Sequence, residues 1–456
     1  MNPNQRLLAL CALGYSDDID PDVRRAWRRF LRRSHFNPAQ ILHDHGFPVR
    51  IRRAPALDRS RIPYDLGLLG GGDGGVEGLG FGSPEGFYSN VHFLPKDVAR
   101  LAYALQLDRP GEDLIVRDLD VAMDVALAAV CHRTMRVGNG PWVSPVWALT
   151  LTLYHLAGVL VGAVANMFQI HETNAYELIT LTLESIERWS YLLKMQSHPN
   201  VKKIFLDRVD EFCTRINEHT YLEDQFGLVG FCDGTTFDHP LPSRENLNKA
   251  LHGRLYEHGR PQDPTRSYEK AFNFRVLLLT LPSGICIHSS DLSCGRNGDA
   301  AVQSEGDVQD FHIVRNTDTG VSELRWGDDV FKMADDIPEL AGTHTTVRFY
   351  ADKGLSRTGR ILPAVRYCEP DSDEGIFNTV MKRVRVSVEH FIGRIFNLFK
   401  VLTFVWAMKV FKNRTETYIK TATLLTNLHC IIYPNQISQF FNCGPPTLSD
   451  YVVVPP

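Results

Sequence analysis

The spacing of apolar residues separates a helical half of the chain from a strand-rich half. Between residues 87 and 200, apolar side chains recur every three or four positions, which is the period of an amphipathic helix. The segments with this period, all predicted to be helices, are 94–107, 114–130, 146–156, 159–168 and 175–193. Thr173 or Asn174 would cap the last of them, because a side-chain oxygen at that place can accept a bond from a free backbone N–H.

From about residue 227 the pattern changes to short apolar runs separated by turn residues. The runs predicted to be strands are 228–232, 272–281, 285–289 and 345–350. A Pro-Ser-Gly turn at 282–284 joins the second run to the third, and strands at this spacing indicate an antiparallel core. Two helices are predicted after the strands, at 376–401 and 416–432. We therefore expect an α/β domain with a mixed sheet, preceded by a mostly helical domain.

The helices at 159–168 and 175–193 are separated by one short turn. A short helix, a tight turn and a longer helix are typical of a helix-turn-helix, in which the second helix reads DNA. A helical hairpin that contacts no DNA gives the same pattern and is commoner. The second helix also carries the acids Glu177, Glu184 and Glu187. Both interpretations stay open for the candidate helix-turn-helix at 146–193.

Basic residues concentrate near the N-terminus, although the whole chain has a formal net charge of −4. Residues 23–62 hold eleven arginines and only two acids. The four arginines that we select as candidate DNA contacts are Arg28, Arg29, Arg32 and Arg33. They would form an arm that binds phosphates. The alternative is a solvated helix face or a nuclear import signal.

Glycine marks a boundary after this arm. Ten of the twenty residues from 67 to 86 are glycine, a density that disfavours both helix and strand. The expected parts of the chain are a basic region at 1–66, a glycine-rich linker at 67–86, a helical domain at 87–200, the mixed α/β domain at 201–436 and a tail at 437–456.

Length and composition narrow the class of protein. The chain has 456 residues, 44% of them hydrophobic and 22% charged, which is an ordinary globular composition. No uncharged apolar run reaches the roughly 18 residues that a membrane-spanning helix needs, so we expect no membrane partner. The nine cysteines are dispersed and include no Cys-x-x-Cys pair, which favours reduced thiols inside a cell over disulfides or zinc.

Three acids occupy positions where a merely solubilising charge is unfavourable. Asp233 closes the first predicted strand, Asp352 closes the fourth, and Glu389 lies at the edge of an apolar helix stripe. A carboxylate at the edge of a core costs free energy unless it is paired or binds a metal. Each acid alone is better explained as a turn cap or, for Glu389, as a partner of Arg385. Together they predict an oxygen-only site for Mg²⁺ or Mn²⁺, suited to phosphodiester chemistry.

Five segments of the chain resemble the PIF/Harbinger-type DDE transposases in order and spacing. The segments are 231–235, 268–281, 350–354, 388–393 and 424–431. Asp352 follows Asp233 by 119 residues, and Glu389 follows Asp352 by 37. A further family segment that ends in Asp is matched loosely by Gly295 to Asp299. The chain departs from the family in its second block, where Lys353 stands beside the acid.

The resemblance implies an RNase-H-like fold for about residues 200–435, with Asp233, Asp352 and Glu389 as the catalytic and metal-binding triad. It implies a nuclear DNA endonuclease and strand transferase that uses Mg²⁺ or Mn²⁺ to nick transposon ends and to join 3′-hydroxyls to target DNA. It also implies a Myb-like accessory protein and a homo-oligomer on DNA. Candidate phosphate contacts near the third acid are Arg383, Arg385, Arg394 and Lys400. The alternative is a catalytically inactive, domesticated derivative that binds DNA or acts as a scaffold.

Overall fold

The structure, a computed structural model, describes part of the chain. The described residues are 84–120, 143–194, 204–205, 207–221, 227–239, 272–294, 299, 302–303, 312–315, 322–326, 329–332, 348–356, 361–404 and 415–453. All of them belong to one of the two units into which the chain divides, residues 57–456. The arginine-rich arm, with Arg28, Arg29, Arg32 and Arg33, lies outside the described residues, as do linker residues 67–83.

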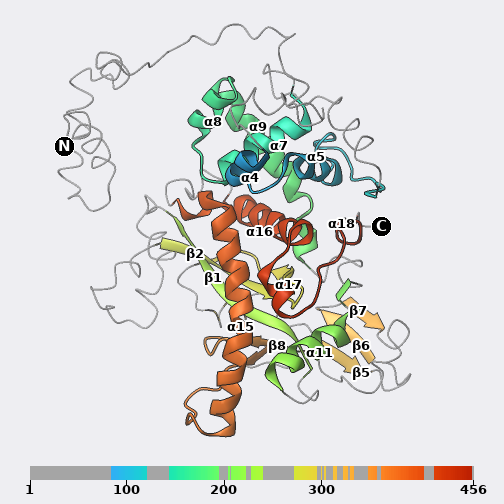
Figure 1. Cartoon of the computed structure of the whole chain (residues 1–456), viewed down its shortest axis with the longest axis vertical. Coiled ribbons are helices and arrows are strands. Elements are labelled where there is room, and N and C mark those ends of the chain that lie inside the picture. Colours follow the sequence, from blue (N-terminus) through green and yellow to red (C-terminus); the bar gives the residue numbers. More distant parts are fainter. Residues whose placement is uncertain are drawn as a thin grey trace, which may run out of the picture. The chain divides into compact units, whose positions relative to one another are not determined.

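A mixed sheet lies at the centre of the second half of the chain (Figure 1). Its strand order is β3-β2-β1-β8-β9, and the short strand β4 pairs with β2. The bounds are β1 (Leu228–His239), β2 (Phe272–Thr280), β3 (Cys286–Ser289), β4 (Ser293–Cys294), β8 (Arg348–Ala351) and β9 (Ile361–Pro363). Strands β1, β2, β3 and β4 pair antiparallel, whereas β8 pairs parallel with both β1 and β9. The expected mixed sheet is confirmed, and the antiparallel core inferred from hairpin spacing describes only half of it.

Strand β1 is longer than its apolar run predicts. It continues past Asp233 to His239, because β2 pairs with it over the whole stretch from Phe231 opposite Thr280 to His239 opposite Phe272. The prediction that Asp233 closes a strand is therefore wrong, since this residue lies within β1 opposite Leu278. Asp352, in contrast, directly follows β8 as expected.

Helices α11 (Val209–Thr220), α15 (Asp373–Leu398), α16 (Thr415–Ile432) and η10 (Lys400–Thr403) pack against this sheet. Helix α17 (Gln436–Phe440) packs against α15, and α18 (Leu448–Tyr451) packs against α16. Helix α15, the long orange helix of Figure 1, contacts β1, β2 and β8. Its buried residues, among them Met381, Val384, Val388, Phe391 and Ile395, recur at helical spacing. Ser372 caps its first turn, where its Oγ accepts a bond from Gly375 N at 3.1 Å.

A second, smaller sheet is antiparallel. It consists of β5 (His312–Arg315), β6 (Ser322–Trp326) and β7 (Asp329–Lys332), in that order. Its three strands lie in the chain between β4 and β8, so they form an insertion between the first and second aspartates of the predicted triad.

The helices before the sheet are α4 (Pro84–Val91), α5 (Pro95–Ala104), α7 (Pro145–Leu156), α8 (Val161–Met167), α9 (Glu172–Glu187) and η3 (Ser190–Leu193). Helix α9 contacts α7, α8 and α16. Its cap is His171, whose Nδ1 accepts a bond from Thr173 N at 3.2 Å, so the predicted caps at 173 and 174 are wrong. The helix-turn-helix interpretation of α8 and α9 stays a prediction.

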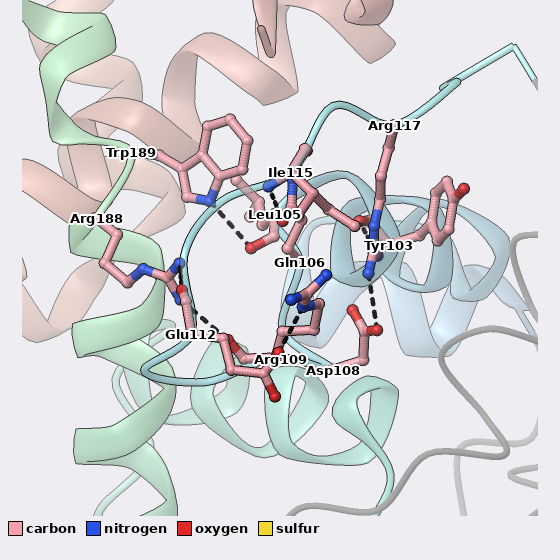
Figure 2. Close-up of polar contacts among 10 residues, drawn as sticks. All are labelled: Tyr103, Leu105, Gln106, Asp108, Arg109, Glu112, Ile115, Arg117, Arg188 and Trp189. Carbon is pink, nitrogen blue, oxygen red and sulfur yellow. Dashed lines mark hydrogen bonds and ion pairs between the residues drawn. The ribbon is translucent and has the colours of Figure 1, made fainter. Parts of the chain in front are cut away.

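The predicted helix at 114–130 begins with a segment that is not helical. Residues 113–118 have no regular structure, and residues 121–130 lie outside the described part. The Gln106 side chain binds the backbone groups of Ile115 that a helix would pair with its own backbone. Its amide accepts a bond from Ile115 N at 3.0 Å and donates to Ile115 O at 2.5 Å (Figure 2). Arg117 adds a bond to Tyr103 O at 3.0 Å and an ion pair with Asp108 at 2.8 Å. Contacts between residues 103–108 and residues 115–117 thus accompany a backbone that is not helical.

Helix α16 connects the helical half to the sheet. Asn427, fully buried on α16, accepts a bond from Cys286 N at 2.8 Å and donates to Cys286 O at 2.6 Å and Tyr451 Oη at 2.7 Å. Just beyond the helix, Tyr433 Oη donates to Asp97 at 2.5 Å.

Among the residues that the structure describes, no helix combines the length and the apolar character that crossing a membrane requires.

Candidate active site

Strand pairing brings two of the three predicted acids together. Cys232 on β1 is the parallel partner of Ala351 on β8. Asp233 is the next residue of β1, and Asp352 is the first residue after β8, so the two acids lie beside each other where the parallel pairing ends. Asp233 Oδ1 also accepts a bond from Gly234 N at 2.9 Å. The sheet register therefore sets the positions of both acids.

The third predicted acid reaches this pair through an arginine. Arg385 Nη1 donates to Asp233 Oδ2 at 2.9 Å, and Arg385 Nη2 donates to Glu389 Oε1 at 2.6 Å. Arg385 and Glu389 are four residues apart on α15, which places them on one face of the helix. Sequence reasoning proposed Arg385 as a partner of Glu389, and the structure adds Asp233 as its second partner.

A fourth acid, Asp299, lies at the same place. A Cβ added to Gly234 would lie 2.4 Å from Asp299 Oδ1, and one added to Gly354 would lie 3.3 Å from Asp299 Oδ2. Arg275, whose side chain is 5% exposed, holds Asp299 through an Nη1–Oδ1 contact of 2.7 Å. The two glycines thus leave the space that Asp299 fills beside Asp233 and Asp352. The loosely matched segment at 295–299 was the only sequence signal for this residue.

The surroundings of Asp233 shift its protonation. Burial raises the pKa of this carboxyl to about 6, and the Arg385 guanidinium and the Gly234 N–H oppose the rise. The negative charges of Asp352 and Asp299 raise the pKa further. A buried carboxyl whose pKa is raised in part by neighbouring carboxylates is typical of sites that bind a cation or transfer a proton.

The donor atoms fit a hard divalent cation. Asp233, Asp352, Asp299 and Glu389 offer only carboxylate oxygens, which are the ligands that Mg²⁺ and Mn²⁺ prefer. In the arrangement described, however, no three His, Cys, Asp or Glu side chains among the described residues lie close enough to hold a metal ion. Arg385 instead places its positive charge between Asp233 and Glu389. Closer approach of the carboxylates therefore requires this guanidinium to move.

The other basic candidates on and after α15 lie elsewhere. Arg383 is exposed and lines a separate pocket with Gln436 and Phe440. Arg394 donates to Pro434 O at 3.3 Å and contacts Cys430 Sγ at 3.6 Å, so it joins α15 to the end of α16. Lys400 is exposed at the first position of η10. Among these four candidates, only Arg385 contacts the acids.

Replacing Arg385 with Gln is expected to tighten Mn²⁺ binding about tenfold at pH 8. The change removes a positive charge within hydrogen-bonding distance of two carboxylates, and such a charge opposes a cation by roughly 1–2 kcal/mol. Electron paramagnetic resonance of free Mn²⁺ measures the affinity directly. Arg383→Gln is the matched control, because it removes the same charge two residues away on the same helix. Unchanged or weaker Mn²⁺ binding by Arg385→Gln would contradict the expectation.

Comparison with known proteins assigns no family to this geometry. The interpretation of the four carboxylates and of Arg385 therefore depends on their chemistry and on the strands and helix that carry them. The chain matches no protein-family model, and no curated protein or solved structure is significantly similar to it.

Proposed function

We propose that the chain is a metal-dependent DNA endonuclease and strand transferase of the DDE transposase type. One observation carries the proposal: Asp233 and Asp352 each follow the last paired residue of the parallel β1–β8 ladder, and Arg385 links Asp233 to Glu389 on the helix that packs against these strands. The order β3-β2-β1-β8-β9, antiparallel on one side of β1 and parallel on the other, is the order expected of an RNase-H-like fold. This order supports the resemblance noted in the sequence.

Asp233, Asp352 and Glu389 would hold the metal. When bound, Mg²⁺ or Mn²⁺ supplies an activated nucleophile and stabilises the leaving oxygen of a phosphodiester. The protein itself positions the three carboxylates, since the β1–β8 register fixes Asp233 and Asp352 and helix α15 carries Glu389. Arg385, once released from the acids, is positioned to pair with a phosphate of the DNA. When DNA binds, Arg385 would then exchange its ion pairs with Asp233 and Glu389 for a contact with a DNA phosphate.

The partners and location in this proposal follow from the family resemblance. They are DNA in the nucleus, a Myb-like accessory protein and a homo-oligomer assembled on DNA. The arginine-rich arm would add phosphate contacts outside the catalytic domain.

A second candidate is a non-catalytic DNA-binding or scaffold protein that has kept the fold. It is favoured by the guanidinium of Arg385 between Asp233 and Glu389, and by the lack of a ready three-ligand cluster among the described residues. Such a protein would bind DNA with or without Mg²⁺ and would cut none.

Nicking of supercoiled plasmid by the purified full-length chain distinguishes the two candidates. We expect relaxed circles with Mg²⁺ or Mn²⁺, none with Ca²⁺ or EDTA, and loss of nicking in Asp352→Asn. Asp371→Asn is the matched control, because Asp371 is exposed and precedes α15. Plasmid binding without cleavage in Mg²⁺ and Mn²⁺ would favour the non-catalytic candidate. Equal cleavage by Asp352→Asn and the wild type would exclude the proposed triad.

A further inference from the structure

A pocket opens directly beside Asp352. Its volume is about 670 Å³, within the range of roughly 300–1,000 Å³ found for small-molecule sites. One side is formed by the turn after β8, including Lys353 and Gly354, and the other by the segment 364–368 and helix α15. Arg385 also lines it, so the pocket and the acidic site share a wall.

Positive charge dominates the lining. The cationic residues of the pocket are Lys353, Arg366, Lys382 and Arg385, and Asp352 is the acid among its lining residues. Lys353, Arg366 and Lys382 are exposed, so their charged ends can meet a ligand from solvent. A cationic rim around a single acid favours an anionic ligand, and charged donors bind phosphate oxygens strongly. Lys382 and Arg385 lie on the face of α15 that also carries Glu389, at spacings of three and four residues.

Tyr367, an aromatic residue, also lines this pocket. Tyr367 is fully exposed, at 104% of the reference area, and its backbone φ of 56° lies in the left-handed region that few residues other than glycine adopt. Asn378 on α15 fixes this segment, because its amide accepts from Val365 N and donates to Val365 O, both at 2.9 Å. Arg366 Nε adds a bond to Lys353 O at 2.8 Å. The segment that carries Tyr367 is thus fixed by Asn378 and Arg366, and the Tyr367 ring is exposed to solvent at the edge of the pocket.

We propose that this pocket binds an unpaired nucleotide of the DNA substrate, with its base stacked on Tyr367 and its phosphates held by Lys382 and Lys353. The inference rests on the proposed function, since it places the ligand next to the candidate active site. A concave site of this volume accepts a nucleotide extruded from a duplex and is too small for the duplex itself. Stacking on an aromatic ring suits any base, so the pocket would recognise an unpaired nucleotide rather than a sequence.

This geometry gives the pocket a role in choosing the phosphate to be cut. Asp352 lines the pocket and is also a predicted metal ligand, so a nucleotide held there has a neighbouring phosphate at the carboxylates. DNA that contains a mismatch, or that is already open, yields such a nucleotide at a lower unstacking cost. We therefore expect the protein to prefer locally unpaired DNA over a perfect duplex.

The test is binding of two short duplexes in Ca²⁺, one fully paired and one with a mismatched 2-aminopurine, by the full-length chain. Tyr367→Ala is expected to weaken binding of the mismatched duplex about tenfold, the usual effect of losing one base stack, and to abolish quenching of 2-aminopurine. Tyr367→Phe should retain both. Tyr221→Ala is the matched control, because Tyr221 is 92% exposed with a φ of 55° at the end of α11. Lys382→Gln should lower the salt dependence of binding by about one phosphate contact.

The outcomes separate this inference from the proposed function. If Tyr367→Ala binds and quenches like the wild type, the nucleotide pocket is wrong, even where Mg²⁺-dependent nicking and its loss in Asp352→Asn stand. If quenching depends on Tyr367 but no metal supports nicking, the pocket stands and the catalytic proposal fails. A wild-type chain that binds neither duplex overturns both.

Discussion

Replacing Asp233 with Asn is expected to abolish Mg²⁺-dependent nicking and, at the same time, to make the folded protein more stable at pH 7.5. The loss of nicking follows from removing one carboxylate of the proposed metal site, and we expect a decrease of at least about a thousandfold, as measured where essential catalytic groups are removed. The gain in stability follows from the surroundings of this side chain. It is only 17% exposed, and burial outweighs the help from Arg385 and from the Gly234 N–H.

The pH dependence of the gain has a definite sign. The pKa of Asp233 is about 6 in the folded protein, above the value of about 3.9 in an unfolded chain. The folded state therefore binds more protons than the unfolded state between these two values, and the free energy of unfolding decreases as the pH rises from about 4 to 6. Above pH 6 the ionised carboxylate costs about 3 kcal/mol, which Asn avoids. Near pH 4 the two proteins should be equally stable.

Urea unfolding at pH 4.5 and pH 7.5, beside the plasmid assay, measures both effects. Asp371→Asn supplies the control, since it removes a charge from an exposed turn. Lower stability of Asp233→Asn at pH 7.5, or nicking at the wild-type rate, would each contradict the expectation. A substitution that increases stability and abolishes activity is typical of a residue in a functional site.

Replacing Asn427 with Ala is expected to lower the free energy of unfolding by about 4 kcal/mol, because three hydrogen bonds are lost in a fully buried place. The change leaves the backbone N–H and C=O of Cys286 and the hydroxyl of Tyr451 without this partner. Urea unfolding measures the loss. Asn397→Ala is the control, because Asn397 is exposed on α15 and the same substitution there should change stability by less than about 0.5 kcal/mol.

Asn427→Asp separates hydrogen bonding from side-chain shape. Its ionised carboxylate keeps the size of the amide but cannot donate to Cys286 O. Stability close to that of the wild type in either variant would contradict the role assigned to this side chain.

The spacing of apolar residues predicts the helices and strands of this chain better than it predicts the features that depend on contacts between them. The helix at 376–401 was found within a few residues, since its apolar stripe is a local property of the sequence. The end of β1 was missed because pairing with β2, not local composition, extends that strand. The coil at 113–118 was missed for a similar reason, since Gln106 satisfies the backbone of Ile115 from outside the segment.

The site residues also separate into those that a local sequence pattern marks and those that only tertiary contacts bring together. Asp233, Asp352 and Glu389 were selected because each acid interrupts a local apolar pattern. The pair of Arg275 and Asp299 had no comparable signal, because the two residues meet only when β2 and the segment after β4 lie together. Tyr367 was also missed, since its backbone conformation and exposure belong to the folded segment.

The parallel ladder between β1 and β8 has a consequence for the order of folding. It joins residues that are 119 positions apart, and closing so long a loop carries an entropic cost that must be met before any contact is gained. The hairpins formed by β1, β2 and β3 need far shorter closures, so they can form first. During synthesis from the N-terminus, β8 and α15 emerge later still. A nascent chain therefore carries no complete set of the three acids until residue 389 has left the ribosome, so the site can assemble only after the helical half, both sheets and most of α15 have been made.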